Sequence, residues 1–198
     1  TVQRQVTVPE GLTSLEIVDI VNGLEFITGD LITDIPPEGS LLPESFAYSR
    51  YHTRQDIIDR MHKDMQSLLD ILWEQRMENL PFETQEEAVT LASIIEKETG
   101  ISSEREMVAG VFVNRLRLGM PLQTDPTVIY ALTEGKSKLD RPLYLKDLKT
   151  EHPYNTYLNA GLPPGPIANP GQASIKAALN PAEHDYLYFV ANGRGGHT

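Results

Sequence analysis

The feature that most constrains the fold is an apolar stripe that recurs at three- and four-residue steps between residues 53 and 79. This spacing places the side chains on one face of a helix, so we predict a long, one-sided helix from about Thr53 to Asn79. The stripe comprises Ile57, Ile58, Met61, Met65, Leu68, Leu69, Leu72 and Trp73. We interpret Met65 and Trp73 as core residues, since both lie on the stripe.

Capping signals predict three more helices. A Thr or Ser followed three residues later by Glu is typical of a capping box, in which side chain and backbone satisfy each other's hydrogen bonds. The pattern occurs at Thr13, Thr84 and Ser103. The predicted helices end near Asn22, Thr99 and Leu118.

Shorter patterns complete the predicted elements. Alternating polarity predicts a strand over residues 2–8, and the apolar run 186–190 predicts another, followed by a turn at Asn192-Gly193. Asp125 before Pro126 predicts the cap of a short helix over residues 127–132, and residues 172–179 predict a further helix. The Pro- and Gly-rich residues 34–45 predict irregular structure. The predicted fold class is α+β, with helices dominating the middle of the chain.

Composition excludes several classes of function. The chain has 198 residues, 17 Lys and Arg against 28 Asp and Glu, and a formal net charge of −11, which disfavours a nucleic-acid partner. It has no Cys, and its five His show no metal-binding spacing, so we expect neither a metal nor a cofactor. No apolar run reaches the ~18 residues of a membrane span. Because the first residue is Thr1, we interpret the chain as a fragment or a processed form from which a targeting segment, if there is one, is missing.

The segment from Leu91 to Gly100 carries the candidate chemistry. On a helix, Glu98 continues the apolar stripe of Leu91, Ile94 and Ile95, whereas Ser93 and Lys97 are expected to face water. Burial and the negative end of the helix dipole both favour the protonated form of a carboxyl group there. A carboxyl group that is protonated at neutral pH is what a general acid requires, which makes Glu98 the candidate.

A second interpretation of Glu98 stays open. A Glu at a helix end more often turns to solvent or pairs with an arginine such as Arg105 or Arg115, and spacing alone favours that outcome. Glu96 cannot face Glu98, because residues two apart on a helix point in different directions. If Glu98 is catalytic, the simplest scheme uses this one residue first as acid and then as base.

Polar and aromatic residues in the loops are candidates for binding a sugar. Tyr rings stack on apolar sugar faces, and amide groups pair with hydroxyl groups. The candidates are Asn114, Gln123, Thr124, Asp125, Tyr130, Tyr154, Asn155 and Tyr157. Asp125 also fits a helix cap, the tyrosines fit core packing with the hydroxyl at the rim, and Asn114 fits a structural bridge equally well.

These motifs together resemble the YceG-like family of MltG-type endolytic murein transglycosylases. The resemblance is dense over residues 84–198 and loose over 1–80. It is carried by the residues 91–99 with Glu96-Lys97-Glu98-Thr99, then 103–105, 111–116, 122–130, 154–157, 161–167 and 188–190, and it continues to Gly195-Gly196-His197.

The resemblance implies a helix-rich, lytic-transglycosylase-like catalytic domain over residues 46–198, truncated at its C-terminal end. It implies that residues 1–45 are part of a small α/β region adjoining a LysM-like module. The expected reaction cuts the MurNAc-GlcNAc bond of peptidoglycan and forms a 1,6-anhydro end, with Glu98 as the catalytic residue and the eight candidates above along the glycan cleft. This activity would limit the length of nascent glycan strands.

The resemblance further implies a full-length protein anchored in the bacterial inner membrane and facing the periplasm, with cell-wall synthases as possible partners. The anchor is expected to lie outside this chain. Two alternatives stay open, a scaffold that binds peptidoglycan and recruits synthases without cutting, and a hydrolase that uses water. The products of glycan digestion distinguish all three.

Overall fold

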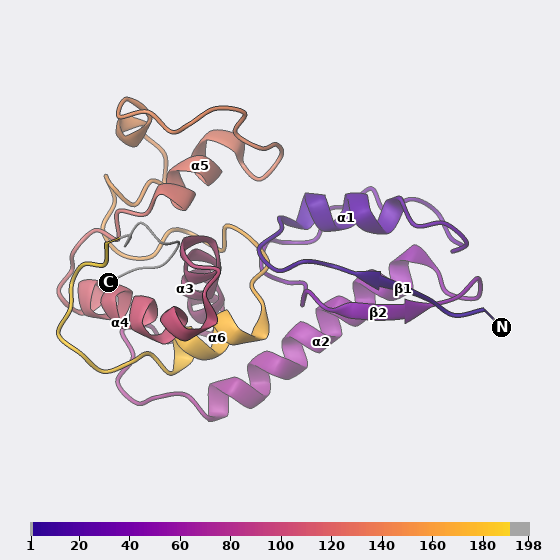
Figure 1. Ribbon diagram of the computed structural model, residues 1–198, viewed down its shortest axis with the longest axis horizontal. Helices are drawn as coiled ribbons and strands as arrows, with labels where there is room; N and C mark the ends of the chain where they lie inside the picture. The colour runs from indigo at the N-terminus through magenta and orange to yellow at the C-terminus, as the bar shows by residue number, and fades with distance from the viewer. Residues whose placement is uncertain (1, 191–198) are drawn as a thin grey trace.

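A two-stranded sheet and two helices form one end of the molecule in the computed structural model, which describes residues 2–190 (Figure 1). Strand β1 (Arg4–Thr7) pairs antiparallel with β2 (Ser45–Tyr48), so that Arg4 lies opposite Tyr48 and Thr7 opposite Ser45. Helix α1 (Ser14–Asn22) begins at the predicted Thr13 capping box and ends at Gly23. The predicted turn at Asn192-Gly193 and the motif Gly195-Gly196-His197 lie outside the described residues.

Helix α2 (Arg54–Glu74) connects two hydrophobic cores. Its first half contributes Ile57, Ile58 and Met61 to the core that also holds the sheet and α1. Its second half contributes Met65, Leu69 and Leu72 to the larger core. The predicted apolar stripe is confirmed as the buried face of this helix, and α2 runs along the lower side of the molecule from the sheet to α6 (Figure 1).

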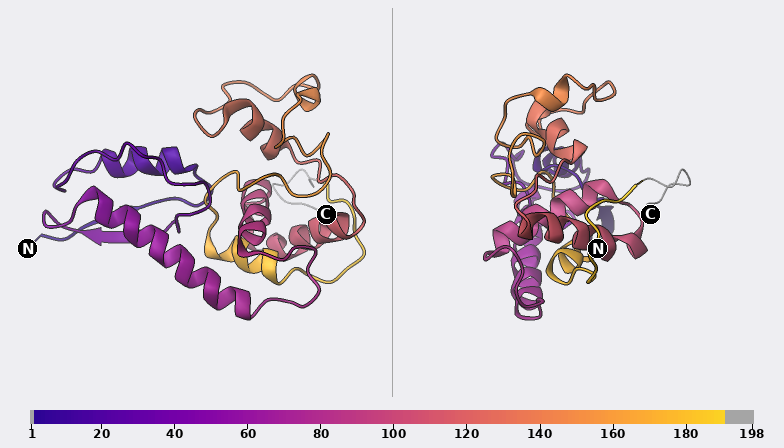
Figure 2. Two further views of the ribbon diagram at one scale, coloured as in Figure 1. Left: turned by 180° about the vertical axis from the view of Figure 1, so that it is seen from behind. Right: turned by 90° about the vertical axis from the view of Figure 1, so that its left-hand side faces the viewer.

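The larger core is built by α3 (Gln85–Glu98), α4 (Arg105–Arg117) and α6 (Gln172–Leu179) packed together. Leu91, Ile94, Ile95, Phe112 and Leu179 are fully buried in it. Helix α5 (Asp125–Thr133) and the long loop after it lie above the end of α3, at one edge of the molecule (Figure 2). This arrangement brings the C-terminal end of α3 and the N-terminal end of α5 to the same region.

Two predicted helix starts are wrong in detail. The capping box at Ser103 and Glu106 does not form, because a short 3-10 helix, η1 (Ser102–Glu104), precedes α4 and the cap at Glu104 has no side-chain hydrogen bond. Thr124 occupies the N-cap position of α5 without a side-chain hydrogen bond to the helix, and Asp125 is in the first turn. The Asp125 carboxylate instead accepts a hydrogen bond from Tyr157, so tertiary contact replaces the predicted local one.

Two other predictions also need correction, and one strand was missed. The run 186–190 is not a strand, because α4 side chains bind its backbone carbonyl groups and no strand lies beside it among the described residues. The long helix ends at Glu74 rather than at Asn79. After Glu74 the chain turns, and the Met77 amide donates a hydrogen bond to the Leu179 carbonyl. Strand β2 was not predicted, because four residues with one polar alternation give little signal.

The change from one core to the other falls within α2, between Met61 and Met65. The sequence-based division between residues 45 and 46 falls inside β2. The assignment of residues 1–45 to a LysM-like region and of residues 46–198 to a catalytic domain stays a prediction. Buried Asn169 ties the two parts together, since its side chain binds the Leu41 amide, the Leu12 carbonyl and the Ser14 hydroxyl.

An ion pair fixes the loop between α5 and the 3-10 helix η2 (Asp147–Lys149). Arg141 holds both oxygens of the Asp147 carboxylate, with N···O distances of 2.6 and 3.0 Å, and the Tyr144 amide donates a third bond at 2.8 Å. The hydrogen bond from Arg141, followed by that from Tyr144, lowers the pKa of Asp147 to about 2.

This ion pair predicts acid loosening of the loop. A carboxylate whose pKa is lowered by folding stabilises the folded form above its ordinary pKa of ~3.9, and the stabilisation is lost as the pH falls through about 2. The protection factor of the Tyr144 amide and its neighbours, which compares their exchange rate with that of an unfolded peptide at the same pH, should therefore fall between about pH 4 and pH 2. An Asp147→Asn variant should show fast exchange already at neutral pH and no acid transition. An unchanged exchange rate in that variant would contradict the role of the pair.

Candidate active site

Helix α3 presents two glutamates whose surroundings differ. Its N-terminal end is fixed by the predicted capping box of Thr84 and Glu87, and its last residue is Glu98. Glu96 lies two positions earlier and points to another side of the helix. The contacts of each carboxylate therefore decide which one is available for chemistry.

Glu96 ties three helices together. Its Oε1 lies 3.4 Å from Nη2 of Arg105, and its Oε2 accepts a 3.0 Å hydrogen bond from the amide of Gly171, which caps α6. Only 6% of the Glu96 side chain and 8% of the Arg105 side chain are exposed. Arg105 also contacts Glu10 at 3.7 Å. Both oxygens of Glu96 are thus engaged in holding the structure.

Glu98 lies half-buried at the C-terminal end of α3, where residues from three other segments meet. Burial raises the pKa of Tyr157, and its hydrogen bond to Asp125 and the charge of Glu98 raise it further. The Tyr157 hydroxyl donates to Oδ1 of Asp125 at 2.7 Å. Glu98, Asp125 and Tyr157 therefore form one electrostatically coupled group. We call these three residues and Arg115 the Glu98 cluster.

Arg115 is the cationic member of the Glu98 cluster. Its Nε donates to the Leu187 carbonyl at 2.7 Å and its Nη1 to the Leu122 carbonyl at 2.6 Å. The guanidinium lies 5.0 Å from the ring centre of Tyr188. Burial lowers the pKa of Arg115, and the nearby Tyr188 and Glu98 oppose that shift. Arg115 therefore connects the loop before α5, the C-terminal segment and the candidate acid.

Sequence reasoning considered Arg115 only as a residue that could neutralise Glu98. Its position as a link between segments was missed, because Leu122 and Leu187 come close to it only in the folded chain. The one available signal was a charged residue inside the apolar run 111–116. Ser93 was also misplaced by the helix wheel, since it is fully buried and binds the Thr90 carbonyl and the Ile167 amide.

The segment before α5 is held by hydrogen bonds to Thr156, and no side chain caps the helix. Gln123 adopts φ of +52° and its amide donates to the Thr156 carbonyl, while its side chain is exposed. The Thr124 amide donates to the Thr156 hydroxyl, which also bonds to Thr127 at 2.7 Å. Thr124 itself is 2% exposed. These contacts place Asp125 next to Tyr157.

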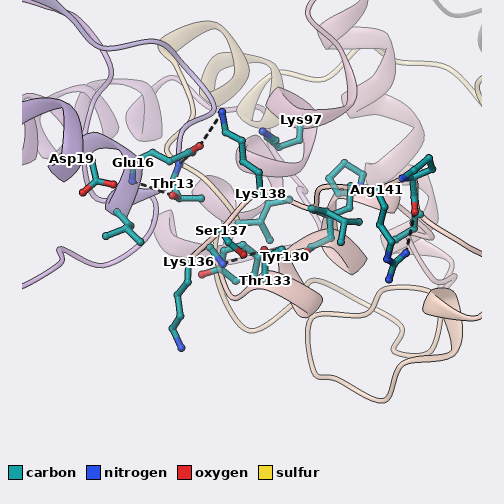
Figure 3. A pocket seen from close by; sticks show the side chains of 18 residues that line it. Thr13, Glu16, Asp19, Lys97, Tyr130, Thr133, Lys136, Ser137, Lys138 and Arg141 are labelled. Atoms are coloured by element: carbon teal, nitrogen blue, oxygen red, sulfur yellow. Dashed lines mark hydrogen bonds and ion pairs between the residues drawn. The ribbon is translucent and has the colours of Figure 1, made fainter.

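The other predicted site residues lie outside the Glu98 cluster. Asn114 donates to the carbonyl groups of His184 and Tyr186, and fully buried Asn155 donates to those of Leu148 and Thr150. Tyr130 and Tyr154 pack with ring centres 4.8 Å apart, and burial followed by the charge of Glu38 raises the pKa of both. Asn114 and Asn155 thus bind backbone, whereas Tyr130 lines a separate cavity (Figure 3).

Close packing at Gly110 holds the C-terminal segment beside α4. A Cβ atom at this position would lie 2.4 Å from the Ala182 carbonyl oxygen and 2.4 Å from Nε2 of His184. Gly110→Ala should therefore destabilise the chain by about 1–3 kcal/mol, despite the better helix propensity of Ala. Thermal unfolding measures the effect. Gly100→Ala is the matched control, since nothing lies within 4 Å of its Cβ position, and an equal effect at both sites would contradict the packing argument.

Among residues 2–190, no cluster of three or more acidic or histidine side chains is arranged to bind a metal ion. Within that same range, no helix combines the length and the apolar character needed to cross a membrane.

The fold and the site define a helix-rich α+β protein with a carboxyl group at a helix end, set beside a buried arginine and a tyrosine. A sequence model of the YceG-like family matches residues 1–198. The chain belongs to the YceG-like family. A crystal structure of a YceG-like protein from Listeria monocytogenes has a TM-score of 0.74 at 34% identity, over 98% of this chain and 72% of that chain.

Two relatives are named endolytic murein transglycosylase. The one from Bacillus subtilis (strain 168) is 46% identical over 161 residues, which cover 81% of this chain and 43% of the relative. The one from Streptococcus pneumoniae (strain ATCC BAA-255 / R6) is 35% identical over 161 residues, which cover 78% of this chain and 28% of the relative. The chain thus spans less than half the length of either relative.

Proposed function

We propose that this chain carries the catalytic centre of an endolytic peptidoglycan lytic transglycosylase, with Glu98 as its acid and base. The observation that carries the proposal is the division of roles on α3. Glu96 is engaged by Arg105 and Gly171, whereas Glu98 stands among Arg115, Tyr157 and their neighbours. The names of the two relatives support the same reaction class.

In the proposed reaction, Glu98 donates its proton to the glycosidic oxygen as the bond from that oxygen to the anomeric carbon of MurNAc breaks. The sugar develops oxocarbenium character, and the C6 hydroxyl of the same sugar attacks the anomeric carbon. The Glu98 carboxylate takes the C6 hydroxyl proton, so the group returns to its starting state and no water is consumed. An internal nucleophile lowers the barrier by several kcal/mol through proximity.

The other members of the Glu98 cluster position the loops around the reacting sugar. Arg115 joins the carbonyl groups of Leu122 and Leu187, and its positive charge stabilises the carboxylate that Glu98 becomes after proton transfer. Asp125 holds the Tyr157 hydroxyl. Gln123 has an exposed side chain two residues before Asp125, and we assign it a contact to the glycan.

The remaining parts of the proposal concern the whole protein. We assign residues 1–45 to a partial α/β region adjoining a LysM-like module. We further propose that the full-length protein is anchored at the inner membrane and faces the periplasm, where it cuts nascent strands beside cell-wall synthases.

Product analysis tests the reaction class. Purified sacculi are digested with the full-length protein, and the released fragments are identified by mass spectrometry. Anhydro-MurNAc ends in new internal fragments are the expected result. Reducing ends would instead identify a hydrolase, and intact glycan that remains bound would identify a scaffold; either outcome overturns the proposal.

A further inference from the structure

A cavity of about 580 Å³ lies between α1 and α5, apart from the four residues of the Glu98 cluster (Figure 3). Its walls come from α1, from α5, from the loop 135–143, and from Lys97 and Ile167. The volume is in the range of sites that hold a small ligand or a short peptide. The reaction proposed above does not use this cavity.

The floor of the cavity is apolar and its rim is charged. Leu15, Pro126, Ile129, Leu139, Leu143 and Ile167 supply apolar surface. Lys97, Lys136, Lys138 and Arg141 outnumber the acidic lining residues Glu16 and Asp19. This local excess of positive charge occurs in a chain whose formal net charge is −11. The lining therefore suits a ligand that combines small apolar groups with carboxylates.

Two of the four cations are placed to meet such a ligand. Arg141 is held by Asp147 and Lys136 by Glu134, whereas Lys138 contacts Glu16 at 3.7 Å with 85% of its side chain exposed. An exposed pair of this kind contributes little stability. Glu16 keeps its hydrogen bond from the Thr13 amide when Lys138 moves away, so Lys138 can exchange its partner for a ligand carboxylate at small cost.

Lys97 is the second cation. Its Nζ donates to the Gly11 carbonyl at 3.2 Å, which engages one of the three N–H groups of an ammonium. Figure 3 shows Lys97 and Lys138 on the same side of the cavity, near Glu16 of α1. A carboxylate that reaches this side would meet two positive charges.

The cavity is joined to the Glu98 cluster through the chain itself. Lys97 directly precedes Glu98 on α3, and Pro126 directly follows Asp125 on α5. The two sites therefore share the same two helix ends. In peptidoglycan, each MurNAc carries on its lactyl group a short peptide that contains alanine methyl groups and carboxylates. A sugar at the Glu98 cluster would carry that branch close to the cavity.

We infer that the cavity between α1 and α5 binds the stem peptide of a MurNAc residue, with alanine methyl groups on the apolar floor and a carboxylate beside Lys138 and Lys97. This inference rests on the proposed function. It makes the peptide branch part of substrate recognition, separate from the contacts to the glycan.

The test measures peptide binding without catalysis. The full-length Glu98→Gln protein is mixed with synthetic L-alanyl-γ-D-glutamyl-L-lysyl-D-alanyl-D-alanine, and saturation-transfer NMR is recorded on the peptide. The alanine methyl signals should receive the strongest saturation. Adding Lys138→Glu should weaken binding by roughly fivefold or more, whereas Lys138→Arg should retain it. Lys63→Glu, an exposed change on α2 away from the cavity, is the control and should leave binding unchanged.

Three results would overturn the inference. These are absence of saturation at the methyl groups, equal binding with Lys138→Glu in a protein of unchanged melting temperature, and displacement of the peptide by glycan strands from which the peptides have been removed. The last result would make the cavity a glycan site. Because the binding assay does not depend on cleavage, its failure is distinguishable from a failure of the product analysis.

Discussion

Replacing Glu98 by Gln should lower the rate of glycan cleavage by about a thousandfold or more. Gln has nearly the same size but cannot donate a proton to the glycosidic oxygen or accept one from the C6 hydroxyl. General acid-base catalysis contributes about 10²–10⁴-fold per positioned group, and here one group serves both steps. The rate is measured as new anhydro ends formed per minute from purified sacculi.

The fold should survive this replacement. Glu98 is the last residue of α3 and only half-buried, so the amide can occupy the same space. The melting temperature should stay close to that of the parent chain, and binding of glycan strands should persist. A Glu98→Gln protein that cuts at the parent rate would refute the assignment of the acid.

Replacing Glu96 by Gln should have its largest effect on stability. The change removes the negative charge that lies 3.4 Å from buried Arg105. The Glu10 carboxylate stays at 3.7 Å from the same guanidinium. Breaking one side of a buried ion pair costs about 3 kcal/mol or more. For a chain of this size, that loss corresponds to a fall in melting temperature of roughly 6–12 °C.

The exposed pair of Arg60 and Asp64 on α2 supplies the control for Glu96. Its N···O distance is 3.5 Å and both side chains are well exposed. Asp64→Asn should therefore change the free energy of unfolding by less than about 1 kcal/mol. If Asp64→Asn and Glu96→Gln destabilise the chain equally, burial of the Glu96 pair does not have the importance assigned to it.

Local sequence patterns predicted the helices well where a cap and an apolar stripe agree. Helix α1 begins at its Thr13 capping box, α3 begins at Thr84, and the stripe of α2 is buried as expected. One prediction that relied on residue type alone failed. The apolar run 186–190 has strand-like residues, but Asn114 and Arg115 bind its carbonyl groups and no partner strand is beside it in the described chain.

The candidate site was predictable only in part for the same reason. Periodicity selected Glu98, but the different role of Glu96 depends on Gly171, which is 75 residues away in sequence. Likewise, the link from Asp125 to Tyr157 spans 32 residues. Residue type in a loop made Asn155 a predicted glycan-binding residue, but its side chain is fully buried and donates to the Leu148 and Thr150 carbonyl groups.

The most direct test of the central claim compares Glu98→Gln and Glu96→Gln side by side, at a temperature where both proteins are folded. The measured quantity is the number of anhydro-MurNAc ends formed per folded molecule. We expect almost none from Glu98→Gln and substantial formation by Glu96→Gln. The reverse result, with Glu96→Gln inactive and Glu98→Gln active, would contradict the account.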